Sequence, residues 1–255
     1  IVCIKQVPDT TDIKVDPETG TLKRETAGTT VNPFDLYAIE EAIRTKEKVG
    51  GKVIAISMGP PKAEEVLKVA IGMGVDDAVL LSDRKFAGAD TYATSYALSQ
   101  TIKKLGYDII FFGKQAIDGD TAQVGPSTSE HLNIPCIAWV RKIKDINPDK
   151  GEIIVERLME DGIEVISSTL PVALTVVKEI NEPRLESLKG KLKAKRYKIP
   201  VWGAKDVECD EGKIGLKGSP TKVKKTWTPE RKYGQAEIFE GTLEEKIEKL
   251  YKVLK

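Results

Sequence analysis

The sequence has little of what a metal centre or a hydrolytic triad needs. His131 is its only histidine, and its three cysteines, Cys3, Cys136 and Cys209, lie far apart and form no Cys-x-x-Cys pair. A multi-histidine metal site is therefore excluded, and a Ser-His-Asp hydrolase is disfavoured. The cysteine spacing predicts neither a disulfide framework nor an iron–sulfur or zinc site. We expect no metal ligands and no side chain acting as catalytic acid, base or nucleophile.

Long apolar runs are also absent. A membrane span needs about 18 or more consecutive apolar residues, and the chain has no such run, so none is predicted. Residues 1–7 are typical of a buried strand and not of a signal peptide, and we expect a cytoplasmic protein. With 255 residues, 40% hydrophobic and 31% charged, the chain is expected to form one main domain with an extension.

The net charge of +1 hides an uneven distribution. Residues 183–232 contain fifteen Lys and Arg against six Asp and Glu, so this segment carries +9 and the rest of the chain −8. The segment has no nucleic-acid recognition module, and Trp202 and Trp227 are too isolated to form a stacking platform. A basic arm that lies along an acidic partner is favoured over nucleic-acid binding.

Apolar strand-like runs alternate with amphipathic helices in the first half of the chain. Strands are expected at residues 1–7, 52–58, 77–81, 107–112 and 136–143, with helices beginning near residues 32, 60, 90 and 121 and a small hairpin at 13–23. Asn32 is the expected cap of the first helix, with Pro33 at its first position. This alternation predicts an α/β fold with a doubly wound, mostly parallel sheet.

The pattern changes after residue 150. Strand-like runs at 152–158, 162–166 and 171–177 have no helices between them and predict an added antiparallel segment. Residues 181–232 show little periodicity and are expected to form an extended C-terminal arm. Thr242 and Glu245 predict a capping box for a last amphipathic helix. We therefore divide the chain into residues 1–180, a nucleotide-binding α/β domain, and residues 181–255, a partner-recognition loop, the arm and the helix.

Residues 113–126 read Gly-Lys-Gln-Ala-Ile-Asp-Gly-Asp-Thr-Ala-Gln-Val-Gly-Pro and join an expected strand to an expected helix. Such a glycine turn brings free N–H groups of the helix start to a place where a phosphate can sit. Asp118, Asp120 and Thr121 are candidate caps, and Gln115 and Gln123 can bond a heterocycle or ribose. The spacing fits ordinary α/β architecture equally well, so both interpretations stay open.

Two familiar phosphate motifs are missing. No Gly-x-Gly-x-x-Gly follows the first strand, and no Gly-x-x-x-x-Gly-Lys-Ser/Thr occurs in the chain. An ordinary nicotinamide dehydrogenase and a nucleotide hydrolase are therefore disfavoured.

Several sequence blocks resemble one known family. Residues 113–125 are similar to the nucleotide-binding loop of the beta subunit of electron transfer flavoproteins. Residues 3–7 (Cys-Ile-Lys-Gln-Val), 31–35 (Val-Asn-Pro-Phe-Asp) and 181–184 (Asn-Glu-Pro-Arg) match further blocks in the same order. The resemblance extends over nearly the whole chain and is loose only in residues 201–232.

The resemblance implies a nucleotide site at the carboxyl ends of the strands. The residues it assigns to this site are Cys3, Asn32, Asp35, Met58, Gly59, Thr91, Thr94, Gly113, Lys114, Gln115, Ala116, Ile117, Asp118, Gly119, Asp120, Thr121, Ala122, Gln123 and Val124. Taken singly, Met58 could equally be a core residue and Gly59 a turn.

In this family the nucleotide is either a structural AMP or a second FAD, which takes a hydride from NADH and bifurcates its electrons to a dehydrogenase and a low-potential acceptor. Residues 119–125 resemble the bifurcating branch, because AMP-containing members tend to have acidic and Asn residues there. Gly119, Thr121 and Ala122 are small and leave room for a dinucleotide. We expect FAD, with AMP as the alternative; a stand-alone ATP-binding regulatory module is a further alternative.

The resemblance also implies partners. The chain would pair with an electron transfer flavoprotein alpha subunit that holds the other FAD, and would exchange electrons with an acyl-CoA dehydrogenase-type or quinone-reducing flavoprotein. Leu188 is the implied apolar anchor, and Arg184, Lys193 and Lys195 complete the implied partner-binding set. An exposed leucine in a charged rim is a plausible binding hot spot.

Overall fold

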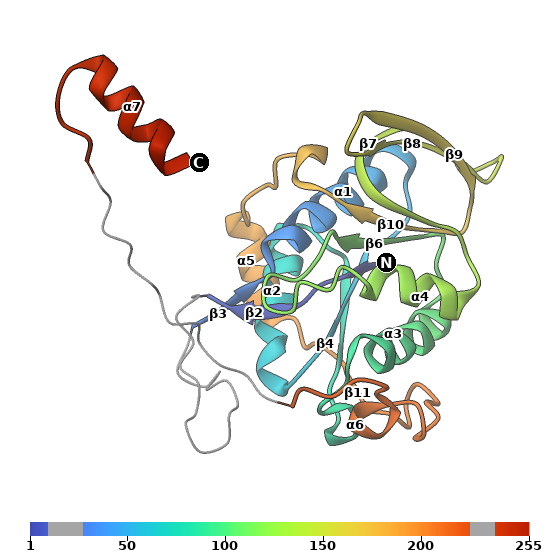
Figure 1. Ribbon diagram of the computed structural model, residues 1–255. Helices are drawn as coiled ribbons and strands as arrows, with labels where there is room; N and C mark the ends of the chain where they lie inside the picture. The colour runs from blue at the N-terminus through green and yellow to red at the C-terminus, as the bar shows by residue number, and fades with distance from the viewer. Residues whose placement is uncertain (10–27, 225–237, 255) are drawn as a thin grey trace.

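A nine-stranded sheet forms the centre of the fold (Figure 1). The computed structural model describes residues 1–9, 28–224 and 238–254, so the hairpin expected at 13–23 lies outside the described residues. The strand order is β11 (Val201–Trp202), β5 (Asp77–Leu81), β4 (Ile54–Met58), β1 (Val2–Cys3), β6 (Ile109–Gly113), β10 (Val172–Val176), β7 (Cys136–Asn147), β8 (Glu152–Leu158) and β9 (Ile163–Thr169).

Strand directions confirm the predicted sheet. Every neighbouring pair from β11 to β7 is parallel. The pairs β7–β8 and β8–β9 are antiparallel and form the added segment. A separate two-stranded antiparallel sheet joins β2 (Gln6–Pro8) to β3 (Thr29–Val31), because the chain leaves the main sheet after Cys3.

Helices cover both faces of the sheet, as Figure 1 shows. One apolar cluster contains residues of α1 (Pro33–Val49), α2 (Glu64–Met73) and α5 (Leu188–Arg196), such as Ile39, Leu67 and Ala194. The other contains Leu98 and Leu132 of α3 (Thr91–Leu105) and α4 (Val124–Leu132). The helices α1, α2 and α3 each bury one apolar stripe, as spacings near 3.6 residues require, and the doubly wound α/β class is confirmed.

The strand order reverses at β1. From β1 the chain continues to β4 and β5 on one side, and then returns to β6 on the other side of β1. Ligands of open α/β sheets bind beyond the carboxyl ends of the strands at such a switch point. Cys3 and Gly113, which end β1 and β6, mark that place here.

Residues 181–202 are more regular than their sequence suggests. They contain α5 and the edge strand β11, whose Val201 pairs with Leu80 of β5. Within α5 only Ala194 is buried, so no apolar periodicity marks the helix. Further along the chain, α6 (Gly215–Gly218) is short.

The last helix, α7 (Leu243–Leu254), has no buried residue. Its predicted capping box is confirmed: the Thr242 N–H donates to Glu245 Oε2 at 2.8 Å and the Glu245 N–H to Thr242 Oγ1 at 3.4 Å. In the three described ranges, no helix combines the length and the apolarity needed to cross a membrane.

Two glycines let α5 approach α2 closely. A Cβ on Gly190 would collide with the carbonyl oxygen of Gly72, and a Cβ on Gly72 would collide with the carboxylate of Glu186. Ser187 caps α5 at the same place, since its Oγ accepts the Gly190 N–H at 2.9 Å. The start of α5 is thus fixed against α2.

We predict that Gly190→Ala destabilises the protein by about 1–3 kcal/mol, the usual cost of overpacking, although alanine favours a helix more than glycine does. Urea denaturation of the purified protein measures the change. Gly162→Ala is the matched control, because a Cβ there meets nothing within 4 Å, and surface changes of this kind stay within about 0.5 kcal/mol. Equal midpoints for the two variants would contradict the close crossing.

Candidate functional site

Asp35, in the first turn of α1, joins the ends of β1 and β6. Its buried carboxylate accepts the Lys5 N–H at 2.7 Å and the Asn32 side-chain amide at 2.9 Å. The Gly113 N–H is a third donor. A Cβ on Gly113 would collide with Asp35 and with the backbone of α1, so only glycine fits there.

Asn32 holds the loop that follows β6. Its Nδ2 donates to the Gln115 carbonyl at 2.8 Å, and its Oδ1 accepts the Ile117 N–H at 3.2 Å. Asn32 holds the expected N-cap position of α1, and its carbonyl accepts the Asp35 N–H at 2.9 Å, but its side chain makes no capping hydrogen bond. Its amide group instead bridges α1 and the loop.

The loop from Lys114 to Gln123 has an unusual backbone. Asp120 and Ala122 both have φ of +54°, a left-handed conformation that is uncommon for residues with a Cβ. This backbone delays α4, which begins at Val124 and not at Thr121 as expected. None of Asp118, Asp120 and Thr121 caps the helix, since Gln123 holds the cap position without a side-chain bond.

The carboxylates of Asp118 and Asp120 already have partners within the protein. Asp118 accepts the Lys5 ammonium at 2.6 Å, and Gln115 donates to Asp120. In contrast, none of the backbone N–H groups from Thr121 to Gly125 has an acceptor within the described residues. Five free donors at the start of a helix form a site for an anion such as a phosphate.

Further expected site residues lie at the same edge of the sheet. Cys3 ends β1, and burial raises the pKa of its thiol to about 12, so it stays protonated and neutral. Met58 ends β4, and the Gly59 N–H donates to the Leu81 carbonyl at 3.0 Å. The half-buried Thr91 and Thr94 lie in the first turn of α3, which Asp90 caps through the Ala93 N–H. These residues thus lie at strand ends or at the start of α3, and their contact with a nucleotide stays a prediction.

The expected partner-binding residues are divided by the structure. Leu188 is 79% exposed, and Lys195 is exposed about two turns further along α5. Lys193 instead donates to the carbonyl oxygens of Val75 and Asp76 at 3.1 and 3.3 Å.

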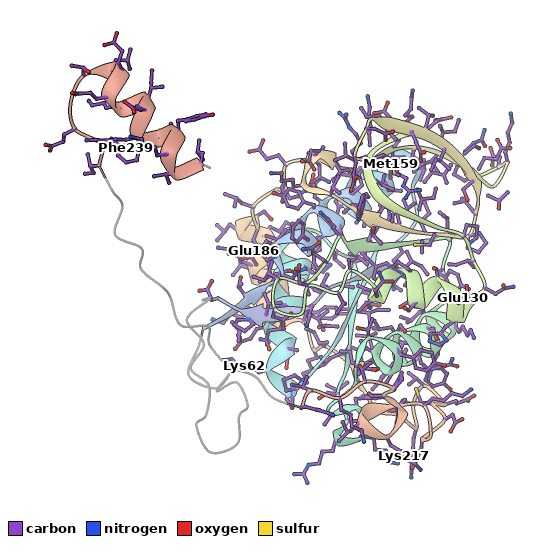
Figure 2. All side chains as sticks on the ribbon, viewed as in Figure 1. Lys62, Glu130, Met159, Glu186, Lys217 and Phe239 are labelled. Carbon is purple, nitrogen blue, oxygen red and sulfur yellow. The ribbon has the colours of Figure 1, made fainter. Side chains whose placement is uncertain are left out.

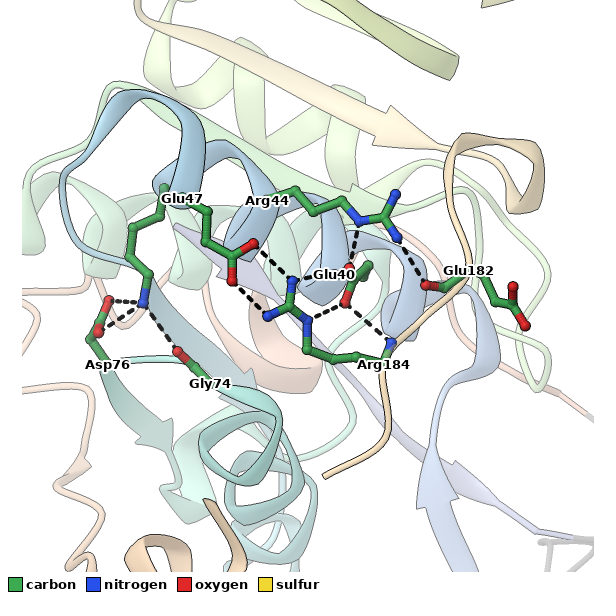
Figure 3. Close-up of polar contacts among 8 residues, drawn as sticks. Glu40, Arg44, Glu47, Gly74, Asp76, Glu182 and Arg184 are labelled. Carbon is green, nitrogen blue, oxygen red and sulfur yellow. Dashed lines mark hydrogen bonds and ion pairs between the residues drawn. The ribbon is translucent and has the colours of Figure 1, made fainter. Parts of the chain in front are cut away.

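Arg184 points toward α1 (Figure 3). Its guanidinium bonds Glu40 at 2.7 Å and Glu47 at 2.7 and 3.0 Å. The carboxylates of Glu47 and Glu40 raise the pKa of Arg184. Burial opposes ionisation of Glu40, but hydrogen bonds from Arg184 and Arg44 hold its pKa below the ordinary value. Arg184 thus fastens its segment to the body of the protein.

The sequence interpretation missed Lys5, Glu40, Glu47 and Leu185. Lys5 stands at the end of the first expected strand, and this position was a usable signal. Glu40 and Glu47 lie on α1, 144 and 137 residues from Arg184, and no local pattern indicates so distant a pair.

Comparisons with known proteins agree with this geometry. Residues 19–207 match the family described as "Electron transfer flavoprotein domain". The chain is 53% identical to the "Electron transfer flavoprotein subunit beta" of Thermoanaerobacterium thermosaccharolyticum over 98% of this chain and 95% of the relative. It is 46% identical to "Caffeyl-CoA reductase-Etf complex subunit CarD" of Acetobacterium woodii, over 95% and 92% of the two chains. It is 45% identical to "Protein FixA" of Azotobacter vinelandii, over 94% and 88%.

We predict that Asp35 makes the protein less stable as the pH rises from 4 to 8. Burial raises the pKa of Asp35 from 3.8 to about 7, against the donors that surround it. The folded state then holds a proton that the unfolded state releases, so stability is present below pH 4 and is lost as the pH passes 7. One pKa unit corresponds to about 1.4 kcal/mol. Urea denaturation between pH 4 and 8 should therefore show a loss of roughly 2–4 kcal/mol from this group.

The control for this prediction is Asp35→Asn, which cannot titrate. This variant should be less stable than the wild type at low pH, because its amide cannot accept hydrogen bonds from all three donors. Its stability should fall less steeply than that of the wild type as the pH rises. Glu41→Gln is a second control, since burial also raises the pKa of Glu41. An equal slope in the wild type and in Asp35→Asn would show that Asp35 is already ionised at low pH.

Proposed function

The chain belongs to the electron transfer flavoprotein family, as a beta subunit, and from this premise we propose that the carboxyl edge of its sheet binds FAD and that the subunit takes part in electron bifurcation. A beta subunit of this family implies an alpha subunit as its partner. The observation that supports nucleotide binding most directly is the set of free backbone N–H groups from Thr121 to Gly125. Phosphate oxygens would accept these donors at the start of α4.

The neighbouring residues fit a nucleotide in three ways. The side-chain amide of Gln123 would bond a ribose or heterocycle edge, whereas the amide nitrogen of Gln115 already donates to Asp120. Asn32 and Asp35 fix the backbone of the loop without needing to contact the nucleotide. Gly125 lets the first turn of α4 pack directly on the sheet, because a Cβ there would come within 2.7 Å of Thr175.

FAD is favoured over AMP by the space beside the loop. A Cβ on Gly119 would meet nothing within 4 Å, so the loop is open on the side where a dinucleotide needs room. When bound, FAD would accept a hydride from NADH and pass the two electrons to different acceptors. The protein would supply binding and orientation, and the neutral Cys3 thiol would add no charge near the nucleotide. AMP in a non-bifurcating carrier is the second candidate, and the family assignment disfavours a stand-alone ATP-binding module.

The electron acceptor would meet the chain at residues 181–196. We expect an acyl-CoA dehydrogenase-type or quinone-reducing flavoprotein, and the name of the 46% identical CarD places that relative in a complex with a reductase of a CoA ester. The exposed Leu188 is the expected apolar anchor. The exposed Lys195 lies on the same helix and would attract an acidic partner.

We predict that the complex of this chain with its alpha subunit contains two FAD molecules and no AMP. Acid extraction followed by chromatography separates and counts the nucleotides. The reason is the open side of the loop at Gly119 and the phosphate site before α4. One FAD with one AMP per heterodimer would contradict the bifurcating assignment and support the AMP-containing carrier.

We predict that Leu188→Ala impairs electron delivery to a dehydrogenase without loss of flavin. An apolar anchor that fills a pocket contributes about 2 kcal/mol or more, so the KM for the dehydrogenase should rise at least tenfold. Steady-state reduction of the source organism's short-chain acyl-CoA dehydrogenase by the NADH-fed complex measures the effect, and flavin absorbance is the control. Loss of flavin in the variant would argue against a partner-binding role.

A further inference from the structure

Three exposed leucines lie together on the segment that carries Leu188. Leu185 is 91% exposed, Leu188 79% and Leu192 52%. Leu188 and Leu192 are four residues apart on α5 and therefore share one face of the helix. Leu185 precedes the helix by three residues, which span at most about 11 Å. We call these three residues the leucine patch.

Polar contacts hold the chain on both sides of Leu185. On one side, Arg184 bonds Glu40 and Glu47, and its own N–H donates to Glu40 at 3.2 Å (Figure 3). On the other side, Ser187 caps α5 against the glycine crossing with α2. Leu185 and Glu186 lie between these two fixed points, and the side chain of Leu185 is 91% exposed.

The start of the segment, at Asn181 and Glu182, is fixed as well. The side-chain amide of Asn181 donates to the Tyr37 carbonyl and to Glu41, each at 3.0 Å. The Arg44 guanidinium reaches the Glu182 carbonyl at 3.3 Å (Figure 3). Because the backbone at Leu185 is already fixed, binding a partner would cost little further conformational entropy there. This is the advantage of a pre-organised surface.

Cations border the leucine patch. Helical spacing places Lys191 beside Leu188, and Lys195 and Arg196 beside Leu192, and all of these cations are exposed. Glu186 is the nearest carboxylate, and Lys191 approaches it at 3.9 Å. In Figure 2, Glu186 lies on the side of the molecule that carries α5, and Glu130 of α4 lies on the opposite side. The patch is therefore separate from the α3–α4 side of the molecule.

We infer that Leu185 is a second apolar anchor beside Leu188, and that the partner offers an apolar pocket for both, bordered by carboxylates. This inference rests on the proposed role of residues 181–196 in meeting a flavoprotein partner. Arg184 is a positioning residue that aims Leu185, and it does not itself contact the partner. The complementary charge selects an acidic protein surface.

A lipid surface fits the patch less well than a protein pocket does. Interfacial helices usually present a long apolar face and often tryptophan or phenylalanine, whereas α5 has nine residues and no aromatic side chain. Its remaining contacts with α2 keep the helix in place and leave only the short leucine stripe free.

The test uses the intact complex of this chain with its alpha subunit and the short-chain acyl-CoA dehydrogenase of the source organism. Leu185→Ala should raise the KM for the dehydrogenase about tenfold, while kcat at saturating dehydrogenase and the flavin content stay unchanged. The double variant Leu185→Ala/Leu188→Ala should raise it further. Leu216→Ala is the control at an exposed leucine outside the patch, because Leu216 is 52% exposed, as Leu192 is, and lies on α6.

Arg184 is tested separately by Arg184→Gln and Arg184→Lys. The glutamine variant should raise the KM and increase hydrogen exchange of the amides at residues 182–187, with no change in the exchange of β4 to β6. Lysine retains the charge but cannot form the two-pronged contact, so it should restore only part of the affinity. Unchanged exchange and KM in Arg184→Gln would overturn the positioning role.

The outcomes separate this inference from the proposed function. If Leu188→Ala raises the KM and Leu185→Ala does not, the second anchor is disproved and the proposed partner loop stands. If neither variant changes the KM of an active complex, the second anchor and the proposed partner loop are both disproved. Binding of the complex to phosphatidylglycerol vesicles that depends on Leu185, with an unchanged KM, would assign the patch to a lipid surface and overturn the inference.

Discussion

Two buried carboxylates on α1 determine where the functional segments of this protein lie. Asp35 in the first turn accepts donors from the ends of β1 and β6, and Glu40, which is 2% exposed, accepts two arginines. The two residues are five positions apart, or about 7.5 Å along the helix. One rigid helix therefore positions both the loop at the carboxyl edge of the sheet and the segment that presents Leu185 and Leu188.

Burying a carboxylate costs several kcal/mol before its partners are counted, so neither residue is an efficient source of stability. What the carboxylates provide is a unique position, since a charge that loses one partner in a buried site is strongly unfavourable. Asp35 and Glu40 differ in how their protonation responds to the cost of burying a charge. Asp35 is surrounded by neutral donors and its pKa rises, whereas arginines hold the pKa of Glu40 low. We therefore expect the loop at Asp35, and not the segment at Glu40, to respond to pH near neutrality.

The sequence was sufficient for the sheet and for most of its helices, because apolar runs that end in glycine or proline mark β4, β6 and the helix starts that follow them. Family resemblance was needed for the residues of the nucleotide loop. The late start of α4 could not be predicted, because nothing local shows that Asp120 and Ala122 adopt a left-handed backbone. The helix α5 was missed for a different reason. Its packing depends on Gly72 and Gly190, which carry no apolar pattern.

The placement of Arg184 adds a structural role that its motif did not indicate, while its part in partner binding stays a prediction. The block Asn-Glu-Pro-Arg resembles a recognition element, so an arginine within it suggests contact with a partner. In the structure its guanidinium already bonds two carboxylates of α1, and only a partner that offered better acceptors could release it. The exposed side chain is instead the next residue, Leu185. The inferred recognition would therefore be divided between a partly buried arginine that fixes the backbone and an exposed leucine that uses the fixed position.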